Sequence, residues 1–112
     1  GRSIFLMLLN LTERMGKEIT DSEKLETQME ILKEVIRSSF RRGDLFTTYS
    51  KSQYMIILVG TEKENCNKAF TRCLDRWKQT EGAKGELSYS VESLVKMLNP
   101  ELSQEGETPD WK

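Results

Sequence analysis

Few side chains in this sequence have the types and spacing that catalysis or metal binding requires. There is no histidine, which removes the commonest general base, the Ser-His and Cys-His nucleophile pairs and most zinc sites. The two cysteines, Cys66 and Cys73, are seven residues apart, and on one helix their Cα atoms would lie about 10 Å apart, too far for a disulfide. We therefore predict two reduced thiols that pack as small hydrophobic groups, as is usual in the cytoplasm.

Cations gather around one predicted hairpin. Arg41 and Arg42 precede it and Lys51 lies at its tip, so these three residues could form a small site for an anionic ligand. Solvated surface cations are the simpler interpretation. The chain as a whole has 17 basic and 18 acidic residues and a net charge of −1, which argues against a free-standing DNA-binding domain.

One domain must position these residues, because 112 residues leave no room for two cores. The apolar runs 4–11 and 54–59 predict interior strands that are covered on both faces. Segments 45–49 and 53–59, separated by three residues, predict a hairpin. Alternation over 87–91 predicts a half-exposed fourth strand.

Two amphipathic helices are predicted between these strands, because apolar residues recur at steps of three and four over 25–40 and 66–77. Gly43 is expected to end the first helix in the left-handed conformation. Capping-box spacing places the two helix starts at Thr20 with Glu23 and at Thr61 with Glu64.

The element order β-α-β-β-α-β predicts an α+β, ferredoxin-like fold, with an antiparallel sheet and two helices on one face. We assign residues 1–98 to this domain, with its core over 3–94, and residues 99–112 to a polar tail or linker. Residues 93–98 could add one helical turn. The apolar strands imply that the other face of the sheet is also covered, by the tail or by a part of the parent protein. Because no methionine precedes the first strand, we expect the chain to be a fragment of a longer protein.

The segment RRGDLFTTYSKSQY, residues 41–54, resembles the signature region of GGDEF (diguanylate cyclase) domains. In that family a helix ends in R-x-x-D, five residues follow, and the GGDEF hairpin comes next. The resemblance spans roughly residues 3–94 and implies a nucleotide cyclase-like fold. The final helix and strand of the family have no counterpart in the sequence.

The resemblance also shows where this sequence departs from the family's active members, in which hairpin glycines approach the nucleotide and acidic residues hold magnesium. Ser50 and Lys51 stand at the glycine positions, Ser52 and Gln53 replace the acidic pair, and Asn10 occupies the place of the first-strand aspartate. Amide and hydroxyl groups cannot neutralise the ion or the developing phosphate charge. The resemblance thus implies a domain that is not an enzyme, with no catalytic residue, metal site or cofactor.

Arg41 and Asp44 match the R-x-x-D of the family's inhibitory site, which binds cyclic di-GMP through arginine contacts to guanine and phosphate. These two residues are our candidate ligand-binding residues. The alternative interpretation is structural, because Arg41 suits a helix C-terminus and Asp44 can begin the turn into the next strand.

The stretch RRGDLFTTYSKSQYMIILVGTEKENCNKAFTRCL resembles the degenerate cyclase-like domain of some bacterial SARP-type transcriptional activators, of the bacterial transcriptional activator domain family. This resemblance implies a non-catalytic regulatory or interaction domain of a bacterial transcriptional regulator. A sensor of a nucleotide such as cyclic di-GMP is the alternative. Expected partners are other domains of the parent regulator, with a homodimer as a further option and DNA bound only through a separate domain. The longest apolar run has six residues, against about 20 for a membrane span, so we expect a cytoplasmic domain.

Overall fold

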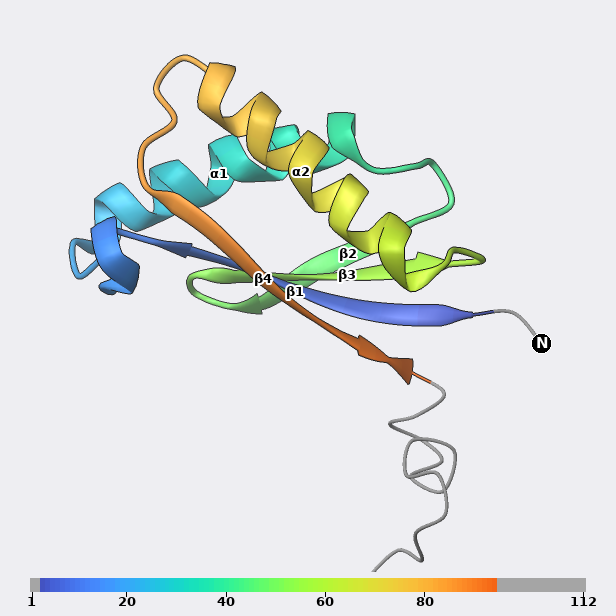
Figure 1. Cartoon of the computed structure of the whole chain (residues 1–112). Coiled ribbons are helices and arrows are strands. Elements are labelled where there is room, and N and C mark those ends of the chain that lie inside the picture. The colour runs from blue at the N-terminus through green and yellow to red at the C-terminus, as the bar shows by residue number, and fades with distance from the viewer. Residues whose placement is uncertain (1–2, 95–112) are drawn as a thin grey trace, which may run out of the picture.

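The computed structural model describes residues 3–94 and confirms the predicted order of elements. They are β1 (Ile4–Thr12), α1 (Ser22–Ser39), β2 (Leu45–Ser50), β3 (Gln53–Val59), α2 (Lys63–Gln79) and β4 (Glu86–Ser93), with a short 3-10 helix, η1 (Arg14–Gly16), in the loop after β1. The strands form one sheet in the order β2-β3-β1-β4, and each neighbouring pair is antiparallel. Both helices lie on the same face of this sheet (Figure 1). The α+β, ferredoxin-like architecture is therefore as predicted. Within residues 3–94 no helix is long and apolar enough to cross a membrane.

The core lies between the sheet and the two helices. Burial alternates strictly along β1 and β3, since successive side chains point to opposite faces of a strand. The two central strands are apolar except for Asn10, Thr12 and Gln53. Among residues 3–94 helices cover only one of their faces (Figure 1), so the predicted cover on the second face is not seen in this range. The buried side chains that face the helices include Phe5, Met7, Leu9, Leu11, Tyr54, Ile56 and Leu58, and those from the helices include Leu25, Met29, Leu32, Ile36, Cys66, Phe70, Cys73 and Trp77.

The predicted ends of α1 are wrong. Its N-cap is Asp21, whose carboxylate accepts a hydrogen bond from Lys24 N at 3.2 Å, so Thr20 lies one residue too early. The helix ends at Ser39, because Phe40 adopts an extended conformation (φ −104°, ψ 162°) and packs half-buried against the core. Gly43 therefore lies beyond the helix, and its φ is not positive.

The predicted start of α2 is also wrong by one residue. The N-cap is Glu62, which makes no side-chain capping bond, so the Thr61 and Glu64 capping box does not form. The carbonyl of Glu62 is nevertheless used, since it accepts from Asn65 N at 3.0 Å.

The hairpin between β2 and β3 is tighter than predicted. Ser50 belongs to β2, which leaves a two-residue connection, Lys51 and Ser52, after an irregularity in register between Thr48 and Ser50. Neither connecting residue has a positive φ, so this turn does not require glycine. Leu11 N donates to Ser52 O at 2.9 Å, which ties the hairpin to the end of β1.

Cys66 and Cys73 are free thiols buried in the core, as predicted. Tyr54 and Trp77 are buried aromatic residues, and burial raises the pKa of the Tyr54 hydroxyl. Tyr49 is 58% exposed and lies at the irregular end of β2.

The buried thiol of Cys73 predicts a loss of stability at alkaline pH. Burial raises its pKa from an ordinary value of 9.0 to about 11. Between these values the unfolded chain has lost the proton and the folded chain keeps it, so the free energy of unfolding falls as pH rises, by up to about 1.4 kcal/mol per pH unit. Urea unfolding of the wild type and of Cys73→Ala across this window should show the steeper fall in the wild type. Parallel pH profiles would contradict the assignment.

Candidate functional site

Several residues singled out by the resemblance to GGDEF domains form a cluster of hydrogen bonds at one end of the central strands. Asn10 on β1 lies opposite both Gln53 on β3 and Ser88 on β4. Gln53 Nε2 donates to Asn10 Oδ1 at 2.6 Å, and Ser50 Oγ donates to Gln53 Oε1 at 2.8 Å. Asn10 Nδ2 donates to Ser88 Oγ at 3.4 Å. We call Asn10, Ser50, Gln53 and Ser88 the polar cluster.

The polar cluster is electrically neutral and its side chains are paired with one another. The side-chain oxygens of Asn10 and Gln53 each accept a bond from a neighbouring member, so one of the two lone pairs on each oxygen is already in use. Magnesium prefers carboxylate and water oxygens in octahedral geometry, and the cluster holds no carboxylate. Among residues 3–94, no group of three or more His, Cys, Asp or Glu could hold a metal. The donor set does not fit a magnesium ion.

Ser52 and Lys51 contribute differently to this end of the hairpin. Ser52 N donates to Ser50 Oγ at 3.4 Å, so Ser52 supports the polar cluster through its backbone. Lys51 is exposed and lines a surface groove of about 380 Å³ with Met29, Glu30 and Tyr54.

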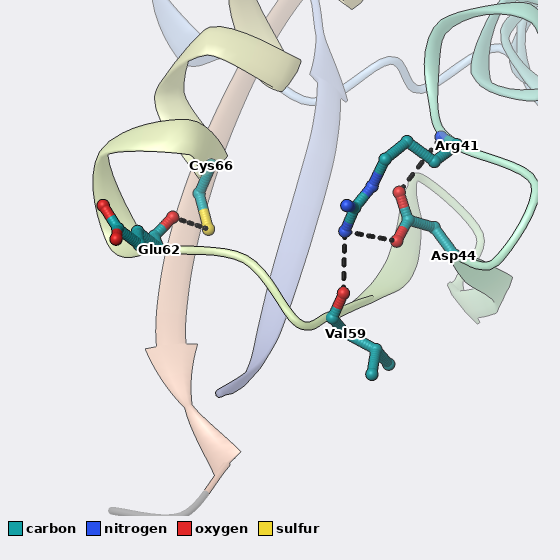
Figure 2. A network of polar contacts seen from close by, with 5 residues as sticks. All are labelled: Arg41, Asp44, Val59, Glu62 and Cys66. Atoms are coloured by element: carbon teal, nitrogen blue, oxygen red, sulfur yellow. Dashed lines mark hydrogen bonds and ion pairs between the residues drawn. The ribbon is translucent and has the colours of Figure 1, made fainter. Parts of the chain in front are cut away.

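Arg41 and Asp44 form a compact turn between α1 and β2 (Figure 2). Asp44 Oδ2 accepts from Arg41 N, and Asp44 N donates to Arg41 O, each at 3.0 Å. Arg41 Nη2 donates to Val59 O at 2.7 Å and to Asp44 Oδ1 at 3.5 Å. The Asp44 side chain is 4% exposed and that of Arg41 is 55% exposed. Asp44 therefore holds the turn, while Arg41 joins it to the end of β3 and still faces solvent.

The Arg41–Asp44 turn lines a cavity of about 260 Å³ between β3 and α2, which we call the cationic cavity. Lys68 and Arg72 face it from α2. Arg72 Nε donates to Ser39 O at 2.7 Å, whereas Lys68 is exposed and pairs with no other residue in the range 3–94. Three cations thus surround one buried carboxylate. The remaining lining residues are Leu58, Thr61, Asn65 and Ala69.

The structure does not bring Lys51 to the two arginines, which favours the interpretation of these residues as solvated surface cations over a shared site for an anionic ligand. Lys51 precedes the first residue of β3, whereas Arg41 binds the carbonyl of its last residue, Val59. A strand of seven residues separates its ends by about 20 Å. Proximity in sequence did not predict proximity in space here, because the tip and the base of a hairpin lie at opposite ends of its strands.

Sequence reasoning also missed Lys68, Arg72 and Ser88. The i, i+4 spacing of Lys68 and Arg72 places both on one face of a helix, and that signal could have been used. Ser88 gives no comparable signal, because it meets Asn10 across 78 positions of sequence.

Cys66 follows Asn65, which lines the cationic cavity, but its surroundings disfavour the reactive thiolate. Its Sγ donates weakly to Glu62 O at 3.8 Å (Figure 2). Burial raises the pKa of this thiol, and the negative charges of Asp44 and Glu64 raise it further. The thiolate, which is the reactive form, is therefore disfavoured.

Comparisons with solved structures support the fold. The chain is similar to an EAL/GGDEF domain protein from M. capsulatus (17% identity, TM-score 0.61), covering 84% of this chain and 65% of that one. It is similar to a DGC protein from Thermotoga maritima (14%, TM-score 0.65), covering 96% and 79%. It is also similar to the diguanylate cyclase SiaD from Pseudomonas aeruginosa, solved with its activator SiaC (14%, TM-score 0.56), covering 87% and 42%.

These similarities concern the fold alone, because the sequence identities are low. The chain spans less than two thirds of the length of the M. capsulatus and P. aeruginosa chains. No protein-family model matches the sequence, and no curated protein matches it.

The Arg41–Asp44 turn predicts a measurable contribution of Asp44 to stability. Asp44→Ala removes both acceptors and leaves Arg41 N without its partner, so the free energy of unfolding should fall by about 1–3 kcal/mol. Asp75→Ala, at an exposed carboxylate on α2, is the control and should change it by less than about 0.5 kcal/mol. Equal effects of the two variants in urea unfolding would show that the turn does not depend on Asp44.

Proposed function

We propose that this domain is a non-catalytic regulatory or interaction domain of a bacterial transcriptional regulator, built on a GGDEF-like fold. The observation that supports it is the polar cluster. At the positions that carry the metal ligands in active GGDEF domains, Asn10 and Gln53 present amides that are hydrogen-bonded to each other at 2.6 Å. The place in a transcriptional regulator is inferred from the resemblance to SARP-type activators.

We expect no catalysis because the polar cluster lacks negative charge. Phosphoryl and nucleotidyl transfer depend on metal ions that neutralise the charge of the phosphates in the transition state. The polar cluster supplies no negative charge to retain such an ion, and its oxygens are already hydrogen-bonded. The Lys51 side chain adds a cation at the hairpin tip, which opposes metal binding further.

A regulatory role would then use the domain's surface for contacts with other domains of the parent regulator or with a second copy. One similar structure, SiaD, was solved in complex with a protein activator, which is an example of this fold in a protein complex. For the present chain, such contacts form part of the proposal.

The proposal predicts no product when the wild type is incubated with GTP and magnesium, beside an active diguanylate cyclase as positive control. The double variant Asn10→Asp, Gln53→Glu tests whether the neutral amides are what prevents magnesium binding. Two carboxylates in place of the paired amides should repel each other, so its melting temperature should be lower than that of the wild type and should rise on addition of millimolar magnesium. The wild type should show no magnesium-dependent shift.

Two results would contradict this proposal. Formation of cyclic di-GMP by the wild type would show that the neutral cluster supports catalysis. A magnesium-dependent rise in the wild-type melting temperature that Asn10→Ala abolishes would show that the cluster binds the metal as it stands.

The cationic cavity favours a second candidate function, a sensor of a nucleotide such as cyclic di-GMP. Arg41 and Lys68 are exposed cations on its rim, and phosphate groups pair favourably with both. Asp44, by contrast, is committed to the turn. In this alternative, Arg41 would contact the ligand and Asp44 would hold Arg41 in place.

Calorimetry and thermal melting with cyclic di-GMP test this second function. If the cavity binds it, ligand at 100 times Kd should stabilise the fold by about 2.7 kcal/mol. Lys68→Ala should weaken binding without changing the stability of the free protein, while the control Lys78→Ala, on the same helix but outside the cavity, should bind normally. No heat and no melting shift in the wild type would exclude the sensor.

A further inference from the structure

The face of the sheet that points away from α1 and α2 has an apolar centre. We call it the open face. Strand register places alternate residues of β1 and β3 there in opposed pairs, and all of them are only half-buried. Its apolar members are Ile4, Leu6, Leu8, Met55, Ile57 and Val59.

The rim of the open face is mostly polar, in contrast to its centre. The exception is Leu45 on β2, which lies opposite Ile57 and is 63% exposed. Thr47 on β2 lies opposite Met55, and Ser90 and Glu92 on β4 lie opposite Leu8 and Leu6. Antiparallel sheets that face water on one side normally carry polar residues across that whole side. An apolar centre inside a polar rim is instead typical of a surface that another element covers.

The footprint of this apolar centre suits a short helix. It is two strands wide, about 5 Å between strands, and a helix with its side chains is about 10–12 Å in diameter. Leu6 and Leu8, with their partners Ile57 and Met55, therefore need only one or two helical turns to cover them.

The chain that follows β4 starts at the right place for this role. Ser93 lies opposite Phe5, so β4 ends beside the Leu6 end of the open face. Leu94 is already helical. The sequence continues with Val95, Met97 and Leu98, whose spacing with Leu94 gives an apolar stripe on one side of a helix, and the Asn99-Pro100 pair then favours its end.

We propose that the segment 94–102 folds back over the open face and buries Leu94, Val95 and Leu98 against Leu6, Leu8 and Ile57. A tethered segment has an effective concentration in the millimolar range, so it outcompetes a second copy of the chain for the same surface. This inference is independent of the proposed regulatory function, since it concerns the completion of the fold.

Disulfide trapping tests the contact in the full chain. Leu6→Cys with Leu98→Cys should form an intramolecular disulfide under mild oxidation, about tenfold faster than the control pair Thr71→Cys with Leu98→Cys. Thr71 is exposed on α2, on the other side of the sheet. The native Cys66 and Cys73 are buried and should not compete, and the single-cysteine variants measure this directly. The reduced double variant should melt below the wild type, because two apolar side chains of the proposed contact are shortened.

A variant that leaves the described fold untouched provides the second measurement. Leu98→Glu should lower the melting temperature and increase binding of a dye that reports exposed apolar surface. Ser103→Glu adds the same charge nearby and should do neither.

Three outcomes would overturn the proposal. Equal rates for the two cysteine pairs would mean that the segment does not dock. A disulfide-linked dimer as the main product of the Leu6 pair would mean that a second copy occupies the face. Identical melting and dye binding for Leu98→Glu and Ser103→Glu would mean that Leu98 is not buried.

Discussion

The antiparallel pairing of β1 with β3 is the constraint on which the rest of this structure depends. Its register, from Ile4 opposite Val59 to Asn10 opposite Gln53, decides which side chains face the helices and which face away. The same register sets Asn10 beside Gln53, so that their amides bond, and it fixes the carbonyl of Val59 where Arg41 reaches it. A shift by one residue would exchange the two faces of the sheet and separate both sets of contacts.

This central ladder also explains why the molecule has two chemically different ends. At one end the strands carry the neutral polar cluster, where each amide oxygen already accepts a hydrogen bond. At the other end the sheet meets the Arg41–Asp44 turn and the cations of α2. The polar cluster contains no charged side chain. The cationic end retains accessible charge on Arg41 and Lys68, and it can still meet an anionic group.

Much of the fold could be predicted from the sequence, because apolar residues recur in it with the periods of strands and helices. The apolar runs of β1 and β3 and the helical spacing of residues 25–40 and 66–77 gave the correct order of elements. Helix ends were less predictable, because Asp21 and Thr20 are both good caps and tertiary packing of Phe40 ended α1 early. The cationic cavity and the contact of Asn10 with Ser88 depend on residues far apart in sequence, and local patterns do not contain them. The predictions for residues 99–112 concern a part of the chain outside the described range.

The central claim is that paired neutral amides replace the metal ligands of an active GGDEF domain. The most direct measurement is an NMR titration of the ¹⁵N-labelled protein with GTP and manganese, a paramagnetic substitute for magnesium that broadens nearby resonances. The side-chain amide signals of Asn10 and Gln53 should keep their intensity, like that of Asn65, which lines the cationic cavity at the other end of the central strands. Selective loss of the Asn10 and Gln53 signals would place a metal at the polar cluster and contradict this account.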